Sequence, residues 1–362
     1  MKIILANPAH DVQLRNIVRS ESMPGHIQVA YEREPSFLQG LETQGTFNQV
    51  IAAEEDGKIL LFGCRSIRPM FINGERIDFG YLSSLRSTPL AKQKLGVARS
   101  YKTLREVHED GRCLGYISTI INGNVEAVST LTHGRAGLPY YKNMGTCRTV
   151  AIPLRKRKHA SHPNISIRFA KPGGGALVVR LLENFGKQNQ FFPALTKSDF
   201  GTPLLRDLPI TQFLIAEQNG EACGIAALWD QSKFKQHRIR KYSPALRLAK
   251  PFLNGGLKLA GYSPMPKEGE QLKNAYFCFK AARNHNPKIL QALLHHACNH
   301  LHQAGYSHCI TGFHNDDPAT SIVKHYPATT YRSRLFFTGW ENDLKTFDQL
   351  DGRVLYFDPA IL

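Results

Sequence analysis

Apolar and polar residues alternate regularly over residues 47–85. Three runs rich in apolar and β-branched residues, at residues 47–54, 59–67 and 77–85, predict strands. Short polar segments separate these runs, and each contains a strong turn signal, Asp56-Gly57 in the first and Asn73-Gly74 in the second. The pattern therefore predicts a three-strand antiparallel meander.

The spacing becomes helical after this meander. Apolar residues recur at intervals of three and four over residues 97–110, which predicts a helix that ends at Gly111. Residues 114–121 predict another strand, and residues 125–132 predict a short helix.

The loop that leads into the first long helix reads Gln93-Lys94-Leu95-Gly96-Val97-Ala98. The first turn of a helix has free N–H groups and a partial positive charge, so an anion binds well there. Gly96 lets the backbone approach such an anion, and Ala98 is nearly as small. The loop is not a P-loop, because no Gly-Lys-Ser/Thr follows. It is not a dinucleotide fingerprint either, because Lys94 and Leu95 stand where glycines would be. A pyrophosphate-bearing cofactor is therefore predicted.

The loop resembles the acetyl-CoA loop of the GNAT acetyltransferase superfamily, whose pattern is Arg or Gln, two residues, Gly, one residue, and Gly or Ala. The family places this loop between its fourth strand and third helix, after a three-strand meander. The resemblance covers roughly residues 1–154. It implies acetyl-CoA as a cosubstrate, held along the pantetheine by Ser84, Leu85, Arg86 and Asn124, and at the pyrophosphate by Gln93, Lys94, Leu95, Gly96, Val97 and Ala98.

The resemblance also implies acetyl transfer to an amine, which needs two proton transfers. An ammonium acceptor must lose a proton, and the CoA thiolate must gain one. Family members often use a Tyr seven residues after an Asn like Asn124, but Leu131 stands there. Tyr140 and Tyr141 are the candidate acids, with aromatic packing as the alternative reading. Ordered water is one candidate base, and the side-chain candidates on or beside the meander are Glu54, Glu55 and Asp78.

The same order of elements returns after residue 164. Helices are predicted at residues 176–185 and 287–304, with Leu290, Leu293, Ala297 and Leu301 on one stripe of the second. The predicted strands are residues 165–170, 213–217, 222–229, 272–282, 307–313 and 330–337. We therefore predict an α/β fold of the α+β type with two GNAT-like domains, each a mixed, mostly antiparallel sheet flanked by helices. The domains are residues 1–154 and 165–362, with a basic linker at residues 155–164.

We expect only the first domain to bind acetyl-CoA. The corresponding segment of the second domain, residues 283–288, has no glycine, and Pro287 removes one of the N–H groups that a phosphate would use. The Lys171-Pro172-Gly173-Gly174-Gly175 segment reads as a flexible turn or an anion nest.

The second domain carries a long insertion at residues 230–271, in which basic and aromatic residues are mixed. A loop of this length is often functional. We expect it at the rim of an acceptor cleft between the two domains, with a dimer contact or plain packing as the alternatives. His296 and His300 are spaced i, i+4, but neither the zinc-protease Glu nor a third ligand is evident, so no metal is expected.

Composition changes this picture in two ways. Seven cysteines without a Cys-x-x-Cys pair, and no apolar run near the length of a membrane span, predict a reduced cytoplasmic protein without a membrane partner. The net charge of +17 attracts polyanions, so nucleic acid is a possible partner besides CoA. The densest basic run, residues 155–159, reads as a solvated linker or a nucleic-acid patch.

The predicted function is therefore acetyl-CoA-dependent N-acetyl transfer to an unidentified amine. The alternative is a nucleic-acid-binding or non-catalytic acyl-CoA-binding protein on a GNAT scaffold. Binding of acetyl-CoA would favour the enzyme, whereas an affinity that falls steeply with salt would favour nucleic acid.

Overall fold

The computed structural model describes residues 1–20, 22–23, 25–88, 91, 96–132, 137–155 and 164–362. The predicted linker at residues 155–164 lies outside the described residues except at its two ends.

The first half of the chain forms the predicted meander and the helix that follows it. The two hairpin turns have the backbone that their sequences predict, because Asp56, Gly57, Asn73 and Gly74 all have positive φ. The elements of this half are β1 (Lys2–Leu5), α1 (Asp11–Ser20), β2 (Ser22–Met23), β3 (Ile27–Glu32), α2 (Phe37–Leu41), β4 (Phe47–Glu55), β5 (Lys58–Ile72), β6 (Glu75–Ser87), α4 (Gly96–His108), β7 (Tyr116–Ile121), α5 (Val125–Thr132) and β8 (Tyr140–Pro153), with a 3-10 turn η1 (Pro8–His10).

The second half repeats this order with additions. Its helices and strands are β9 (Ser166–Phe169), α6 (Gly175–Gly186), β10 (Asn189–Gln190), β11 (Phe192–Pro193), β12 (Phe213–Gln218), β13 (Glu221–Trp229), β14 (Gln236–Tyr242), α7 (Pro244–Leu259), β15 (Asn274–Ala282), α8 (Pro287–Gln303), β16 (His308–His314), β17 (Thr329–Gly339), α9 (Leu344–Asp348) and β18 (Val354–Leu355). Its 3-10 turns are η2 (Lys197–Asp199), η3 (Pro203–Leu205), η4 (Ile210–Gln212), η5 (Arg283–His285), η6 (Pro318–Val323) and η7 (Glu341–Asp343). The stripe predicted on α8 is buried, as expected for a helix that covers a sheet.

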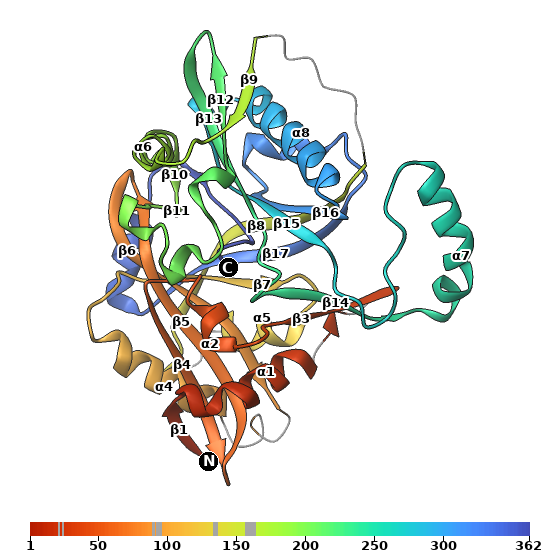
Figure 1. The fold of residues 1–362 in the computed structure, drawn as a ribbon. Coiled ribbons are helices and arrows are strands. Elements are labelled where there is room, and N and C mark those ends of the chain that lie inside the picture. The colour runs from red at the N-terminus through yellow and green to blue at the C-terminus, as the bar shows by residue number, and fades with distance from the viewer. Residues whose placement is uncertain (21, 24, 89–90, 92–95, 133–136, 156–163) are drawn as a thin grey trace.

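The α/β fold class is confirmed, and the two halves share one sheet. The strand order is β1-β4-β5-β6-β7-β17-β8-β16-β15-β13-β12-β9 (Figure 1). The last long strand of the second half, β17, lies between β7 and β8 of the first half, and β8 pairs with β16. The sheet therefore continues from one half to the other, while the division at residues 155–164 stays a prediction.

The insertion at residues 230–271 is not a plain loop. It contains the strand β14 and the 16-residue helix α7. β14 pairs with β3, so it forms a small sheet with β3 and β2 of the first half. Arg238 and Arg240 of β14 form ion pairs with the buried Glu32 of β3, at 3.0 and 3.4 Å. The insertion therefore joins the two halves, and Figure 1 shows α7 on an arm that stands away from the main sheet.

All seven cysteines are buried and unpaired. Burial alone accounts for them, because a free cysteine packs as a small apolar side chain. Among the described residues, no helix is long and apolar enough to cross a membrane.

Candidate functional site

The strands β6 and β7 pair in parallel for a short stretch and then separate. Their pairing covers Gly80–Tyr116, Tyr81–Ile117 and Leu82–Ser118, although β6 continues to Ser87 and β7 to Ile121. On its other side β6 is irregular, because its register with β5 shifts between Phe62 and Cys64. Ser84 has a positive φ of 55° within this bulge. The segment from Ser83 to Arg86 therefore stays beside β5, but in the described part of the chain it no longer pairs with β7, and Ser83 to Arg86 line an open space.

The helix α4 begins beside this separated segment. Val97 packs in the same apolar cluster as Leu85, and Ala98 is exposed in the first turn of the helix. Gly96 is buried, and a Cβ there would stand 2.9 Å from the carbonyl oxygen of Ala91, so local packing already requires a glycine. Gln93, Lys94 and Leu95 lie outside the described residues.

A cavity of about 990 Å³ opens where β6 and β7 separate. It extends across β8, β16 and β17 to β15, and the small sheet of β3 and β14 covers part of it. One end is lined by apolar side chains, among them Ile51, Leu82, Leu104, Ile120 and Leu131. The cavity therefore spans both halves of the chain, with the insertion contributing to its wall.

Two tyrosine hydroxyls meet in the wall of this cavity. The hydroxyl of Tyr141, on β8, lies 2.6 Å from that of Tyr101, on α4. Burial raises the pKa of both phenols, to about 12 for Tyr101. Both therefore keep their protons at neutral pH, and each can donate one.

The wall of the cavity beside β3 and β14 carries two buried basic side chains. Arg33 is 3% exposed and Lys235 is 8% exposed, and both line the cavity. The Nε of Arg33 donates to the hydroxyl of Tyr31 at 3.2 Å, while Nη1 has no hydrogen-bond partner among the described residues. The Nζ of Lys235 donates to the carbonyl oxygens of Pro359 and Leu362 at 2.8 and 3.1 Å. Burial, with a smaller effect from Arg33, lowers the pKa of Lys235 to about 7.

His237 follows Lys235 on β14 and also lines the cavity. Burial, together with the nearby Lys235, lowers the pKa of His237 to about 4, so its imidazole is neutral at physiological pH. This wall therefore combines the guanidinium of Arg33 with an amine, Lys235, that titrates near neutrality. The ring centroids of Tyr31 and Tyr276 lie 5.8 and 5.0 Å from the Nζ of Lys235.

Five of the thirteen site residues predicted from the sequence line the cavity, and three others lie outside the described residues. Those that line the cavity are Ser84, Leu85, Arg86, Asn124 and Tyr141. Asn124 also has a structural role, because its side chain accepts a hydrogen bond from the N–H of Ala127 in the first turn of α5. Gly96, Val97 and Ala98 form the start of α4 and stand outside the cavity lining.

Tyr140 and Glu54 are separate from this group. Tyr140 is 45% exposed on β8, next to the cavity-lining Tyr141. Glu54 lies near the hairpin end of β4, opposite Lys2 of β1. Neither residue belongs to the lining of the cavity.

Sequence reasoning missed the residues of the cavity wall beside β3 and β14. Arg33, Tyr31 and Tyr276 carry no local motif, and Arg33 is about two hundred positions from Lys235. The mixture of basic and aromatic residues in the insertion, which includes Lys235, was the signal that pointed toward this wall.

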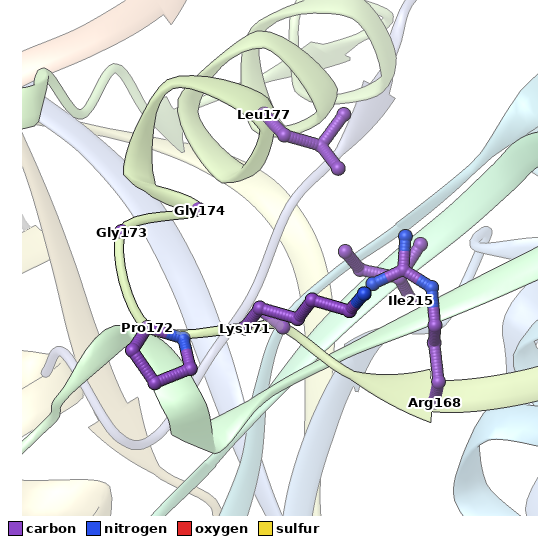
Figure 2. A pocket seen from close by; sticks show the side chains of 8 residues that line it. Arg168, Lys171, Pro172, Gly173, Gly174, Leu177 and Ile215 are labelled. Atoms are coloured by element: carbon purple, nitrogen blue, oxygen red, sulfur yellow. The ribbon is translucent and has the colours of Figure 1, made fainter.

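The segment Lys171–Gly174 borders a second, smaller pocket of about 440 Å³. Figure 2 shows the side chains of Lys171 and Arg168 directed toward one another below the start of α6. The N–H of Gly174 bonds to the carbonyl of Lys171 at 2.9 Å, and Gly173 has a φ of 79°. Arg168 is bound to Glu217 at 2.7 Å. The segment therefore forms a turn that leads into α6.

The segments at the start of α8 and along it have structural roles. Asn286 caps α8 by accepting a hydrogen bond from the N–H of Lys288. The rings of His296 and His300 lie 6.0 and 4.7 Å from the ring of Phe169. Within the described part of the chain, no group of His, Cys, Asp and Glu is arranged to hold a metal ion.

The sequence matches no protein family model and no curated protein. Solved structures do match. A GCN5-related glucosamine N-acetyltransferase region of a fungal multi-domain GH3 β-N-acetylglucosaminidase has a TM-score of 0.58 at 13% identity over 83% of this chain. The chain spans 34% of that protein.

This chain matches a larger share of two further similar structures. Saccharomyces cerevisiae N-myristoyltransferase with bound myristoyl-CoA has a TM-score of 0.58 at 12% identity, over 93% of this chain and 82% of that chain. A GCN5-related N-acetyltransferase from Anabaena variabilis has a TM-score of 0.50 at 13% identity, over 93% and 72%. Likeness at this identity shows the fold. This chain therefore has the same fold as these GCN5-related N-acetyltransferases and the N-myristoyltransferase.

Proposed function

We propose that this protein is an acyl-CoA-dependent N-acyltransferase, with acetyl-CoA as the acyl donor and an amine as the acceptor. The observation that carries the proposal is the cavity that begins at the separated strands β6 and β7 and continues into the second half of the chain. Such a cavity can hold a donor at one end and an acceptor at the other. The fold of the similar structures supports the same reading.

In the proposed complex, the pantetheine lies between β6 and β7, where strand pairing has ended. The pyrophosphate lies at the first turn of α4, whose N–H groups from about Leu95 to Ala98 are the donors. Leu95 lies outside the described residues, so this contact rests on the sequence motif and on the observed start of the helix. The second half offers no equivalent site, since Asn286 already caps α8.

The bulge at Ser84 and Leu85 would act on the thioester. Backbone N–H groups in this segment polarise its carbonyl and stabilise the oxyanion that forms when the amine attacks the carbon. The nitrogen of the intermediate then releases its second proton to solvent, the C–S bond breaks to give the amide, and CoA leaves as a thiolate. Tyr141 donates a proton to that thiolate and is reprotonated from solvent or through Tyr101.

The acceptor would lie against the wall formed by Arg33, Tyr31 and Lys235. The positive charge of Arg33 lowers the pKa of an acceptor ammonium, so the reactive neutral amine is favoured. Lys235 has a pKa of about 7 and is suited to take the proton that the ammonium loses. Glu54 receives no step in this scheme, because it does not line the cavity.

One set of experiments tests both the proposed transfer activity and the length of the acyl group that the protein accepts. A cavity of about 990 Å³ has room for more than an acetyl group, and its apolar end extends beneath α4 and α5. Acetyl-CoA and longer acyl-CoAs are therefore compared by calorimetry, and amines, peptides and tRNA are then screened for release of CoA. We expect one acyl-CoA per chain and amine-dependent release. A protein that binds none of the acyl-CoAs would refute the proposal.

The alternative of a nucleic-acid partner rests on the net charge of +17 alone. Oligonucleotide binding that falls steeply between about 50 and 200 mM salt, without acyl-CoA binding, would favour that alternative.

A further inference from the structure

The insertion that contains α7 has an extreme charge composition. Residues 231–267 include nine Lys or Arg and no Asp or Glu. The acidic residues that follow are engaged locally, since Glu268 binds Arg247 at 2.9 Å and Glu270 accepts from the N–H of Lys267 at 2.8 Å. A strongly positive segment of this kind attracts an anionic partner.

One face of α7 is attached to the rest of the insertion. Leu246 packs with Met265 and Leu272 against a cluster formed by Val29, Ile239 and Tyr242. Lys250 donates to the carbonyl of Pro266, and its Nζ lies 4.5 Å from the ring centroid of Tyr242. The orientation of the helix is therefore fixed by contacts on this inner face.

The outer face carries an exposed apolar stripe. Leu248, Phe252 and Leu259 are 79%, 84% and 92% exposed. At about 100° per residue, positions i, i+4 and i+11 fall within about 40° of one another around the helix. The three side chains therefore form a single ridge, and no residue of α7 is buried by the rest of the chain.

We propose that α7 docks on the surface of an anionic lipid bilayer, with the ridge of Leu248, Phe252 and Leu259 in the membrane interface. An apolar helix face flanked by basic side chains binds such a surface by combining apolar burial with electrostatic attraction. Lys258 and Arg247 lie beside the ridge and are exposed. The helix lies on the bilayer in this arrangement and does not cross it.

Nucleic acid and a second copy of the chain fit this combination of an apolar ridge and basic side chains less well than a bilayer does. Nucleic acid would use the charges, but it offers no apolar surface for two leucines, and α7 has a single aromatic residue for base stacking. A second copy of the chain would offer an apolar ridge, but it would bring two basic segments face to face, each with Lys241, Lys258 and Lys267 exposed.

The docked helix would also bring the cavity close to the bilayer. Leu257, on α7, and Tyr262, just after it, belong to the lining of the cavity. Docking of the ridge is independent of the transfer reaction, so it can be tested with or without an acyl donor.

Sedimentation of the whole protein with lipid vesicles tests the inference. The vesicles contain phosphatidylcholine alone or phosphatidylcholine mixed with phosphatidylglycerol. The variant carries Leu248→Ser and Phe252→Ser together. The matched control is Val12→Ser, at a 56% exposed apolar position on the surface helix α1. Thermal unfolding should be the same in all three proteins, because the altered side chains are mostly solvent-exposed.

We expect the parent protein and Val12→Ser to bind the anionic vesicles, and the double variant to bind at least about tenfold more weakly. Binding should also fall with added salt and be weak on phosphatidylcholine alone. The inference is overturned if the parent protein does not bind anionic vesicles, or if the control loses as much binding as the double variant. A dimer that dissociates in the double variant, without vesicle binding, would assign the ridge to a second copy and overturn it as well.

Discussion

Replacing Ala98 by Asp tests the proposed pyrophosphate site with a single charge. Ala98 is exposed in the first turn of α4, so the new side chain meets solvent and not the core. An acidic residue near a helix N-terminus stabilises the helix by about 0.3–1 kcal/mol, which offsets the weaker helix propensity of Asp. The free energy of unfolding should therefore change little, and any loss of binding must come from repulsion of the ligand.

The size of this repulsion follows from the geometry. A carboxylate about 5 Å from a pyrophosphate with two negative charges costs about 1.7 kcal/mol at the dielectric constant of water, or roughly 15-fold in affinity. The loss is larger where the protein lowers the dielectric constant and smaller where salt screens the charges. We expect the Kd for acetyl-CoA to rise at least about tenfold at low salt, and the rise to shrink as salt is added.

Calorimetry with acetyl-CoA measures this change. The matched control is Ala176→Asp, an exposed position in the first turn of α6 in the second half. It adds the same charge at a similar helix start, and it should leave the Kd unchanged. Equal affinity in Ala98→Asp and the parent protein would refute the phosphate assignment. An equal loss in both variants would show that net charge, and not the position of the charge, governs binding.

Tyr141→Phe should lower kcat about 10²–10⁴-fold, because it removes the proposed acid. The control Tyr101→Phe breaks the same hydrogen bond and should retain most of kcat. Similar losses of kcat in both variants would contradict the assignment of Tyr141 as the acid. Lys235→Met should remove the rise of kcat/KM with pH near neutrality, and a profile like that of the parent protein would exclude Lys235 as the proton acceptor. Burial lowers the pKa of His108, but the hydrogen bonds and charge interactions with Asp343 and Cys113 together outweigh this and raise the pKa to about 9 from its ordinary 6.5. The stability that His108 contributes is therefore complete below pH 6.5 and is lost as the pH rises toward 9. Urea unfolding of His108→Gln should show about 2–3 kcal/mol less of this pH dependence than the parent protein, and equal curves would contradict the reasoning.

The sequence by itself determined the local elements. The meander, the two hairpin turns and the stripe on α8 follow from residue spacing and from turn residues that tolerate positive φ. These features depend on residues only a few positions apart in the sequence, so the sequence of one chain is enough to predict them. The resemblance of the loop before α4 also predicted the GNAT-like fold that the similar solved structures share.

The sequence also predicted Ser84, Leu85, Arg86 and Asn124 as cofactor-binding residues and Tyr141 as a candidate acid. All five line the cavity, and their roles stay predictions. It gave no reason to connect them with Arg33. That residue lies at the end of β3, outside every motif of the family.

Only the tertiary structure decided how the halves combine. The pairing of Ser333 with Ile121, and of Arg238 with Ala30, joins residues about two hundred positions apart. Backbone hydrogen bonds make these pairs, and backbone groups are the same at almost every residue, so no side-chain pattern specifies which strand edge meets which. The wall with Arg33 and Lys235, and therefore the proposed acceptor end of the cavity, exists only because that pairing brings β3 and β14 together.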